Sequence, residues 1–175
     1  GIRVIDAGQI LAAPFCATLL AEFGAEVIKV EPPGAGESNR GSVSFAQDNR
    51  GQKSITLNIA HPDGAALFRR LSDVSDVLVE NNRPGTLEKW GLAPESLRET
   101  NPGLVVVRIS GYGQTGPYRD RAGFDRVALA FAGLTALTGY PGLPPVRPGY
   151  FVADYGAGIF AAFGALLALR SRDLT

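Results

Sequence analysis

The sequence predicts an α/β fold in which a mostly parallel sheet is flanked by helices. Short runs rich in β-branched residues alternate with segments of helical pattern along most of the chain. A strand expected at residues 2–7, a helix at 13–23 and a strand at 26–30 form the strand–helix–strand unit that builds parallel sheets. The run LVVVRI at residues 104–109 is apolar on both faces, so we expect it to be the central strand.

Proline and glycine mark the ends of the expected helices. Pro14 suits the first turn of the first helix, and Gly24 ends that helix. Further strands are expected at residues 54–59 and 76–79, and further helices at 62–71, 84–90, 94–99, 124–137 and 154–170. Loops rich in glycine, proline and polar residues are expected at 31–51, 110–123 and 140–149. A loop as long as the first of these is usually functional.

The composition is typical of one globular domain. The chain has 175 residues, 45% hydrophobic and 19% charged. Lys+Arg and Asp+Glu are both 17, and this balance argues against a nucleic acid partner. Cys16 is the only cysteine, and the start of the chain lacks the pattern of a signal peptide, so we expect a cytoplasmic protein. Asp154 and several glycines interrupt the longest apolar stretch, which we expect to be too short to span a membrane.

GYGQTG at residues 111–116 matches the G-x-G-x-x-G pattern of dinucleotide-binding proteins. That fingerprint needs its third glycine inside an opening helix and an acidic residue about 20 positions later. Here Pro117 follows directly, and the next helix is expected only at residue 124. We interpret the segment as a loop, either beside a ligand or as a plain surface turn.

His61 and Cys16 are the only histidine and the only cysteine. They are too few, and too far apart in the sequence, for a zinc site, so no metal site is expected. No G-x-S-x-G elbow is present to form a serine hydrolase site with His61. We expect His61, at a helix start, to be structural, and Cys16, on an apolar helix, to lie in the core.

Asn81 and Asn82 follow an expected strand within the block ENNRPGTLEKWG at residues 80–91. Open parallel sheets bind ligands just past the carboxyl ends of their strands. These side chains could contact a ligand or cap the next short helix, and capping is the simpler interpretation. Lys89 could meet a phosphate or remain solvated.

Asp154 lies in FVADYGAG, at the start of the long apolar helix. One interpretation is an N-cap. The other is a nucleophile, because a helix N-terminus would hold the carboxylate ionised, and an ionised carboxylate needs no base to attack. Gly156 and Gly158 would let a bulky substrate approach the backbone. These residues alone do not decide between the two interpretations.

Five blocks in order carry a resemblance to a known family. They are GIRVIDAGQILAAPFCATLLAEFGAEVIKVEPPGAGESNR, NRGQKSITLNI, VLVENNRPGTLEKWGL, VVVRISGYGQTGPY and PPVRPGYFVADYGAGIFAAFGALLALRSR. In order and spacing they resemble the N-terminal half of family III (CaiB/BaiF-type) CoA-transferases over essentially the whole chain. The resemblance implies the Rossmann-like large domain of that fold, without its small domain. The lack of methionine and the end just after a helical pattern agree with one domain, residues 1–175, truncated at its C-terminus.

The resemblance also implies a site and a reaction. Asp154 would be the nucleophile that moves CoA between an acyl-CoA and a small carboxylic acid, through an aspartyl anhydride and an aspartyl-CoA thioester. CoA would be a co-substrate, with no covalently bound cofactor, and the full-length protein would be an interlinked homodimer. The implied CoA contacts are Leu11, Ala12, Leu57, Asn58, Asn81, Asn82, Lys89, Ser110 and Tyr112. Some members carry basic or glutamine side chains where this chain has Leu11, Pro32 and Ser110, so contacts there would be apolar or from the backbone.

Two alternatives remain open. The α-methylacyl-CoA racemases resemble the same family and pair the aspartate with a histidine in an A-G-H-D segment, because racemisation needs two acid/base groups. This chain reads AGFD at residues 122–125, and Phe124 cannot carry a proton, which favours a transferase. The other alternative is a non-catalytic CoA-binding fragment, because a glycine-rich loop near the family's active site belongs to the later half.

Overall fold

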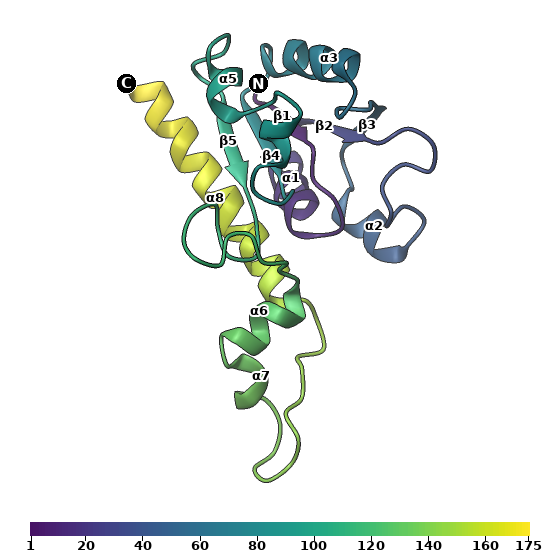
Figure 1. The fold of residues 1–175 in the computed structure, drawn as a ribbon, viewed down its shortest axis with the longest axis vertical. Coiled ribbons are helices and arrows are strands. Elements are labelled where there is room, and N and C mark those ends of the chain that lie inside the picture. The colour runs from purple at the N-terminus through teal and green to yellow at the C-terminus, as the bar shows by residue number, and fades with distance from the viewer.

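Five parallel strands form one sheet in the computed structural model, which describes residues 1–175 (Figure 1). The strands are β1 (Arg3–Asp6), β2 (Glu26–Glu31), β3 (Lys53–Thr56), β4 (Val77–Glu80) and β5 (Val105–Arg108). Their order across the sheet is β3-β2-β1-β4-β5, so the chain first builds to one side of β1 and then returns to the other. The predicted α/β fold with a parallel sheet is confirmed. The reversal between β1 and β4 is the place where such sheets bind ligands.

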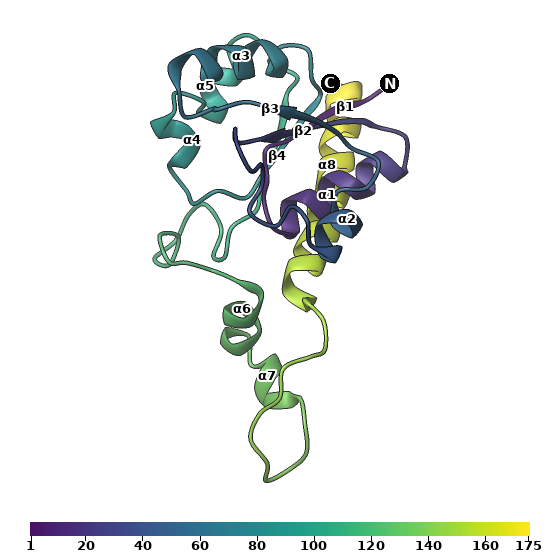
Figure 2. The same cartoon turned by 90° about the vertical axis from the view of Figure 1, so that its right-hand side faces the viewer.

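Helices cover both faces of the sheet, as Figures 1 and 2 show. On one face lie α1 (Ala12–Glu22) and α8 (Val152–Leu174). On the other lie α3 (Pro62–Ser72), α4 (Thr86–Lys89) and α5 (Pro94–Arg98). The result is a three-layer arrangement that leaves the carboxyl ends of the strands free to form a site.

Alternate side chains of β1 and β4 enter two different cores. Val4 of β1 packs with Val77 and Val79 of β4 against α1 and α8. Ile5 and Leu78, the intervening residues, pack on the opposite face. Burial on both faces explains why these two strands lie in largely apolar runs of the sequence.

β5 is an edge strand, so the prediction that residues 104–109 form the central strand is wrong. β5 pairs only with β4, whereas β1 pairs on both sides. α8 packs against one face of β5, while Leu104 and Val106 pack in the core on the other face. The apolar composition of β5 therefore indicates that both of its faces are covered, and it does not indicate that both of its edges are paired.

Two expected elements differ in the structure. The loop expected at residues 31–51 contains α2 (Val43–Asp48), which is too short to show a hydrophobic period. The helix expected at 124–137 is divided into α6 (Asp125–Phe131) and α7 (Leu134–Leu137). Gly133 separates them because its φ of 79° lies outside the helical region.

α8 has 23 residues and extends beyond the predicted helix at both ends. By length and composition it could cross a membrane, so the expectation that this stretch is too short is wrong, although core helices of globular proteins pass the same test. One face of α8 packs against α1 through buried small residues such as Gly158, Ala162 and Ala165. The large apolar residues exposed on α8 are Ile159, Phe160, Phe163, Leu166, Leu167 and Leu174.

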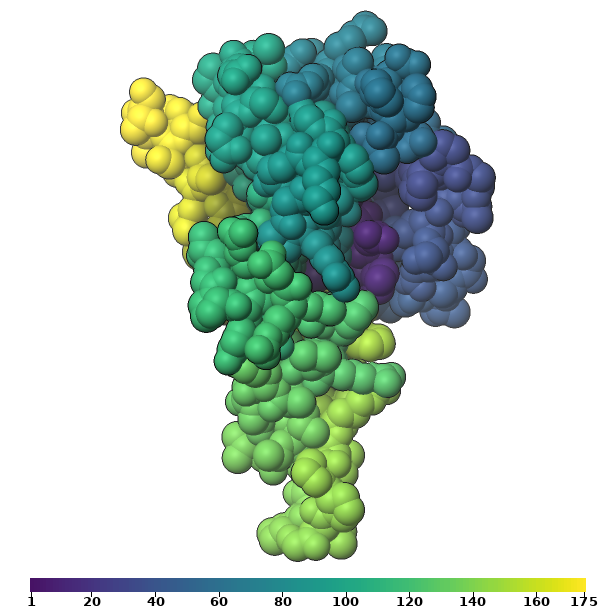
Figure 3. Space-filling view, in the orientation of Figure 1, coloured from purple at the N-terminus to yellow at the C-terminus, as the bar shows by residue number.

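α6, α7 and the segment that leads into α8 form an arm, residues 125–151. Figures 1 and 2 show that the arm projects beyond the sheet at the N-terminal end of α8. In the space-filling view of Figure 3 it is narrower than the body of the molecule. Its exposed apolar residues include Phe131, Leu137, Tyr140 and Leu143. The arm matters for the site because its first residue contacts the start of α8.

Candidate active site

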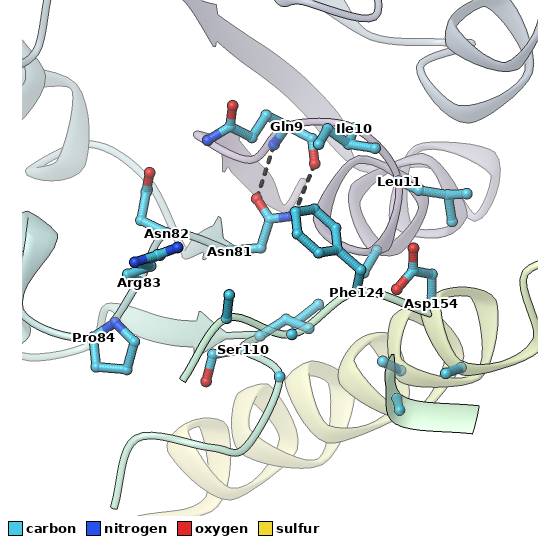
Figure 4. A pocket seen from close by; sticks show the side chains of 18 of the residues that line it. Gln9, Ile10, Leu11, Asn81, Asn82, Arg83, Pro84, Ser110, Phe124 and Asp154 are labelled. Atoms are coloured by element: carbon cyan, nitrogen blue, oxygen red, sulfur yellow. Dashed lines mark hydrogen bonds between the residues drawn. The ribbon is translucent and has the colours of Figure 1, made fainter. Parts of the chain in front are cut away.

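A cavity of about 520 Å³ opens at the carboxyl ends of β1, β4 and β5. Its walls are residues 9–12 after β1, 81–84 after β4 and 109–111 after β5 (Figure 4). Thr86 of α4, residues 121–124, Ala128 of α6 and the first turns of α8 complete the lining. The volume is typical of a small-molecule site, and the position is the reversal of strand order. The cavity is therefore the candidate active site.

Asp154 is the third residue of α8 and does not cap the helix. The N-cap is Phe151, which makes no side-chain capping bond. The Oδ1 atom of Asp125, at the start of α6, accepts hydrogen bonds from the N–H groups of Ala153 at 2.8 Å and Asp154 at 3.4 Å. The N-cap interpretation of Asp154 is wrong, because Asp125 has taken that role. The Asp154 side chain lines the cavity (Figure 4).

Burial raises the pKa of Asp154 from 3.8 to about 6, and repulsion from the buried carboxylate of Asp125 adds to the effect. The sequence led us to expect that the N–H groups of the helix N-terminus hold this carboxylate ionised; instead Asp125 accepts two of those N–H groups, and the pKa of Asp154 is raised and not lowered. A carboxyl group of this pKa is still ionised by about ten to one at pH 7. It is also more basic than an exposed aspartate, which suits a nucleophile.

Gly156 and Gly158 have different roles. A Cβ atom at Gly158 would lie 2.9 Å from the carbonyl oxygen of Ala12 and 3.0 Å from Cδ1 of Phe15. The missing side chain of Gly158 therefore allows α8 to approach α1. A Cβ atom at Gly156 would meet nothing within 4 Å. Gly156 thus has open space beside it but is not part of the cavity lining, whereas the sequence suggested that both glycines give a substrate access to the backbone.

The structure brings six of the ten predicted site residues together. Leu11, Ala12, Asn81, Asn82, Ser110 and Asp154 line the cavity. The other four lie outside its lining: Leu57 and Asn58 after β3, Lys89 at the end of α4, and Tyr112 in the glycine-rich loop. Tyr112 packs edge-to-face against Tyr118 and Phe131, with ring centroids 5.7 and 5.4 Å apart. Contact with CoA stays a prediction for all of these residues.

Asn81 joins two walls of the cavity. Its Nδ2 donates to the carbonyl oxygen of Gln9 at 2.8 Å, and its Oδ1 accepts from the Gln9 N–H at 2.9 Å (Figure 4). The backbone N–H of Asn82 donates to Oε2 of Glu80 at 2.6 Å. α4 begins after Gly85, which has no side chain to form a cap. The capping interpretation of the two asparagines is therefore wrong.

The glycine-rich loop at residues 110–123 closes on itself beside the cavity. A Cβ atom at Gly111 would lie 2.4 Å from Cα of Gly123, so the two ends of the loop touch, and larger residues would separate them. This contact holds Ser110 and Phe124 in the cavity lining. The loop interpretation of GYGQTG is confirmed, since no helix opens there.

Arg83, Arg121 and Asp125 are residues of the site that the sequence alone did not single out. Arg83 and Arg121 are the only cations in the lining, and Asp154 is its only carboxylate. The Arg121 guanidinium lies over the ring of Tyr118, 4.0 Å from its centroid. Arginines in loops are usually solvated, so the sequence around Arg83 and Arg121 does not indicate that they line a site. Asp125 stands directly after Phe124 in the AGFD segment, and that neighbourhood was the available clue.

His61 and Cys16 have the structural roles expected of them. His61 is the N-cap of α3, where its Nδ1 accepts a hydrogen bond from the Asp63 N–H at 3.3 Å. Cys16 is fully buried on α1, and burial raises the pKa of its thiol to about 12. A thiol of that pKa is inert at neutral pH.

Comparison with known proteins agrees with this geometry. The beta subunit of succinyl-CoA–L-malate CoA-transferase from Chloroflexus aurantiacus is 51% identical, in a match that covers 100% of this chain and 46% of that protein. Succinyl-CoA:glutarate CoA-transferase from Homo sapiens is 42% identical, with 96% and 40% covered. The crystal structure of a CAIB/BAIF family protein from Brucella suis superimposes with a TM-score of 0.95 at 36% identity, with 99% and 49% covered.

This chain thus spans about half the length of the relatives it matches. The family model for CoA-transferase family III matches residues 1–175. The chain belongs to CoA-transferase family III, the CaiB/BaiF family.

Proposed function

We propose that the full-length protein transfers CoA from an acyl-CoA thioester to a free carboxylic acid, with Asp154 as the covalent nucleophile. The observation that carries the proposal is the Asp154 carboxylate, which lines the cavity and leaves the capping of its helix to Asp125. With a pKa of about 6 it is ionised at neutral pH, so it needs no separate base to attack. Membership of the family supports CoA as the group transferred.

The first half of the reaction stores the acyl group and then CoA on the protein. An oxygen of Asp154 attacks the thioester carbonyl carbon, the carbon–sulfur bond breaks, and the CoA thiolate leaves behind an acyl–aspartyl anhydride. The thiolate then attacks the aspartyl carbonyl carbon of the anhydride. The donor acid departs as its carboxylate, and Asp154 carries CoA as a thioester.

The second half reverses these steps with the acceptor. The acceptor carboxylate attacks the aspartyl thioester, which releases the CoA thiolate and forms a new anhydride. The thiolate attacks the acceptor acyl carbon, and Asp154 is regenerated as a carboxylate. Covalent storage divides one exchange into easier steps and keeps the energy of the thioester.

We propose succinyl-CoA as the donor and a small dicarboxylic acid as the acceptor. Two relatives are named for succinyl-CoA together with malate or glutarate. The charge of the cavity supports the proposal, because Arg83 and Arg121 accompany Asp154 in its lining. A guanidinium can bind a carboxylate with two parallel hydrogen bonds, so either arginine can take the second carboxylate of such an acid.

Trapping tests the covalent steps. The full-length protein is incubated with succinyl-CoA and quenched with borohydride or hydroxylamine, and the peptide that contains Asp154 is examined by mass spectrometry. We expect a modified Asp154 and, for Asp154→Ala, no modification and a loss of transfer of more than about 1,000-fold. The control Asp120→Ala removes an exposed carboxylate outside the cavity lining and should keep both. Transfer by Asp154→Ala at the wild-type rate would refute the nucleophile.

Racemisation of a 2-methylacyl-CoA is the competing reaction, and Phe124 argues against it. Phe124 lines the cavity with Asp154 and is 64% exposed, but its ring cannot exchange a proton. Incubation with such a thioester in deuterated water, without an acceptor acid, should give no deuterium at the α-carbon. Incorporation of deuterium would favour racemisation.

We propose further that the full-length protein is a cytoplasmic, interlinked homodimer and that α8 is a core helix of it. The exposed apolar residues of α8 and of the arm support burial against other segments. The buried face of α8 packs against α1, which supports a core helix over a membrane span. Size-exclusion chromatography with light scattering, and fractionation of cells without detergent, test these statements. A monomer, or a protein found only in the membrane fraction, would contradict them.

A further inference from the structure

Ile10 has a backbone conformation that β-branched residues rarely adopt. Its φ is 67°, and it is the only non-glycine residue of the chain with a positive φ. The Leu11 N–H donates to the carbonyl oxygen of Gln9 at 3.0 Å, so Ile10 is the centre of a tight three-residue turn. Three-residue turns of positive φ are rare and strained. Such strain persists only where the surrounding structure imposes it.

Three side chains from other loops hold this turn, and we call them the Ile10 clamp: Glu37, Asn39 and Asn81. Asn81 bonds both the N–H and the carbonyl oxygen of Gln9. Oε1 of Glu37 accepts from the Ile10 N–H at 2.5 Å, and Nδ2 of Asn39 donates to the Ile10 carbonyl oxygen at 3.4 Å. All four polar backbone atoms of Gln9 and Ile10 are therefore bonded to side chains distant in sequence.

Glu37 is itself fixed by a buried ion pair. Lys29 Nζ lies 2.7 Å from Oε2 of Glu37 and 3.2 Å from Oδ2 of Asp6, and it also donates to the carbonyl oxygen of Gly8 at 3.2 Å. The side chains of Lys29 and Glu37 are each 2% exposed, and that of Asp6 is 0% exposed. A buried charge is costly unless it is paired, so Lys29 leaves Glu37 little freedom to move. The clamp is therefore rigid on the side of the long loop at residues 31–51.

The strained turn forms one wall of the cavity. Gln9, Ile10, Leu11 and Ala12 all line it, and α1 begins at Ala12. A change of φ at Ile10 would redirect both this wall and the first turn of α1. Glu37 and Asn39 are not part of the lining, and their hydrogen bonds to Ile10 link them to this wall.

We infer that Glu37 and Asn39 are positioning residues for CoA, because they hold Ile10 in the strained turn that shapes the binding wall. The inference rests on the proposed function in taking CoA as the bound molecule. It predicts that the positive-φ conformation of residue 10 is needed for affinity. A glycine at position 10, which adopts positive φ without strain, would make the clamp largely unnecessary.

The test measures the dissociation constant of CoA by calorimetry on the full-length protein, with kcat and KM for succinyl-CoA measured in parallel. We expect Glu37→Ala to weaken CoA binding about tenfold and to raise KM with little change in kcat. Glu37→Gln, which keeps an oxygen for the Ile10 N–H, should lose less. Ile10→Gly in the Glu37→Ala background should restore most of the affinity. Asn49→Ala is the control, because Asn49 lies in the same loop but bonds the carbonyl oxygen of Phe45.

Wild-type affinity in a folded Glu37→Ala variant, or a loss that Ile10→Gly does not reverse, would overturn the inference. If circular dichroism shows that Glu37→Ala does not fold, Asn39→Ala decides in its place, with the same rescue by Ile10→Gly. Because binding is measured without turnover, the two proposals fail separately. Normal transfer by Asp154→Ala would refute only the nucleophile, whereas a wild-type protein that binds no CoA would refute both.

Discussion

Replacement of Asp154 by asparagine is expected to stabilise the fold while it removes the nucleophile. The pKa of Asp154 is raised by burial and by the charge of Asp125, so the folded protein binds this proton more tightly than the unfolded chain does. Ionisation of Asp154 therefore opposes folding, and the penalty grows as the pH rises from about 4 through 6. Asparagine occupies nearly the same volume without the charge, so at neutral pH the variant escapes the penalty.

The pKa shift sets the size of the effect. A rise from 3.8 to about 6 is roughly 2 units, and each unit corresponds to about 1.4 kcal/mol, so the limit is about 3 kcal/mol. Asp154 is only half-buried, and screening by solvent reduces the expected gain to about 1–2 kcal/mol. For a domain of this size, that gain corresponds to a rise in Tm of roughly 2–8 °C.

Thermal unfolding of wild type and Asp154→Asn at pH 8 and pH 5 tests this reasoning. The gain should be largest at pH 8 and fall to about half at pH 5, because the folded wild-type protein has then regained its proton. Asp120→Asn, which changes an exposed carboxylate, should leave Tm unchanged at both pH values. A variant less stable than wild type at pH 8, or a gain that does not depend on pH, would refute the electrostatic account.

Three further expectations follow from the contacts of α8. In the wild-type protein, kcat/KM should rise with pH through about 6, as Asp154 becomes ionised. Asp125→Asn keeps an oxygen for the helix N–H groups but removes the charge, so it should move the midpoint of this pH profile to lower pH. Asp125→Ala also removes the cap and should lower the stability of the protein by about 1 kcal/mol. An unmoved midpoint in Asp125→Asn would contradict the repulsion. Gly158→Ala should destabilise the protein by about 1–3 kcal/mol, because the new Cβ would meet the carbonyl oxygen of Ala12. Gly164→Ala, with open space around it, should stabilise α8 by up to about 1 kcal/mol. Chemical unfolding compares the two variants, and equal effects would contradict the close packing of α8 against α1.

The sheet could be predicted because its strands carry a strong local signal. β1 and β4 are buried on both faces and appear in the sequence as continuous apolar runs. The strand order could not be read in the same way, because the composition of β5 reports which faces are covered and not which edges are paired. α2 was missed for another reason, since six residues are too few to establish a helical period.

The site was predictable in its place but not in its contacts. The rule that ligands bind past the carboxyl ends of parallel strands located Asn81, and the family resemblance located Asp154. The partners of these residues are distant in sequence: Asn81 bonds Gln9, 72 positions away, and Asp125 bonds the N–H of Ala153, 28 positions away. No local pattern specifies such pairs, and for this reason helix capping was the simpler but wrong interpretation of both Asn81 and Asp154.

Asp125 explains how one helix end can hold a carboxylate that is both fixed and basic. A single aspartate at the start of α8 would satisfy the helix N–H groups itself, and those bonds would lower its pKa and occupy its oxygens. In this chain Asp125 takes the bonds, so Asp154 keeps its oxygens for a substrate while its pKa is raised to about 6. Repulsion between the two carboxylates lowers the stability of the fold, and local destabilisation of this kind is typical of functional sites. The strained turn at Ile10, on another wall of the same cavity, is a second local source of instability. We propose a role in CoA binding for this turn and a role in CoA transfer for Asp154.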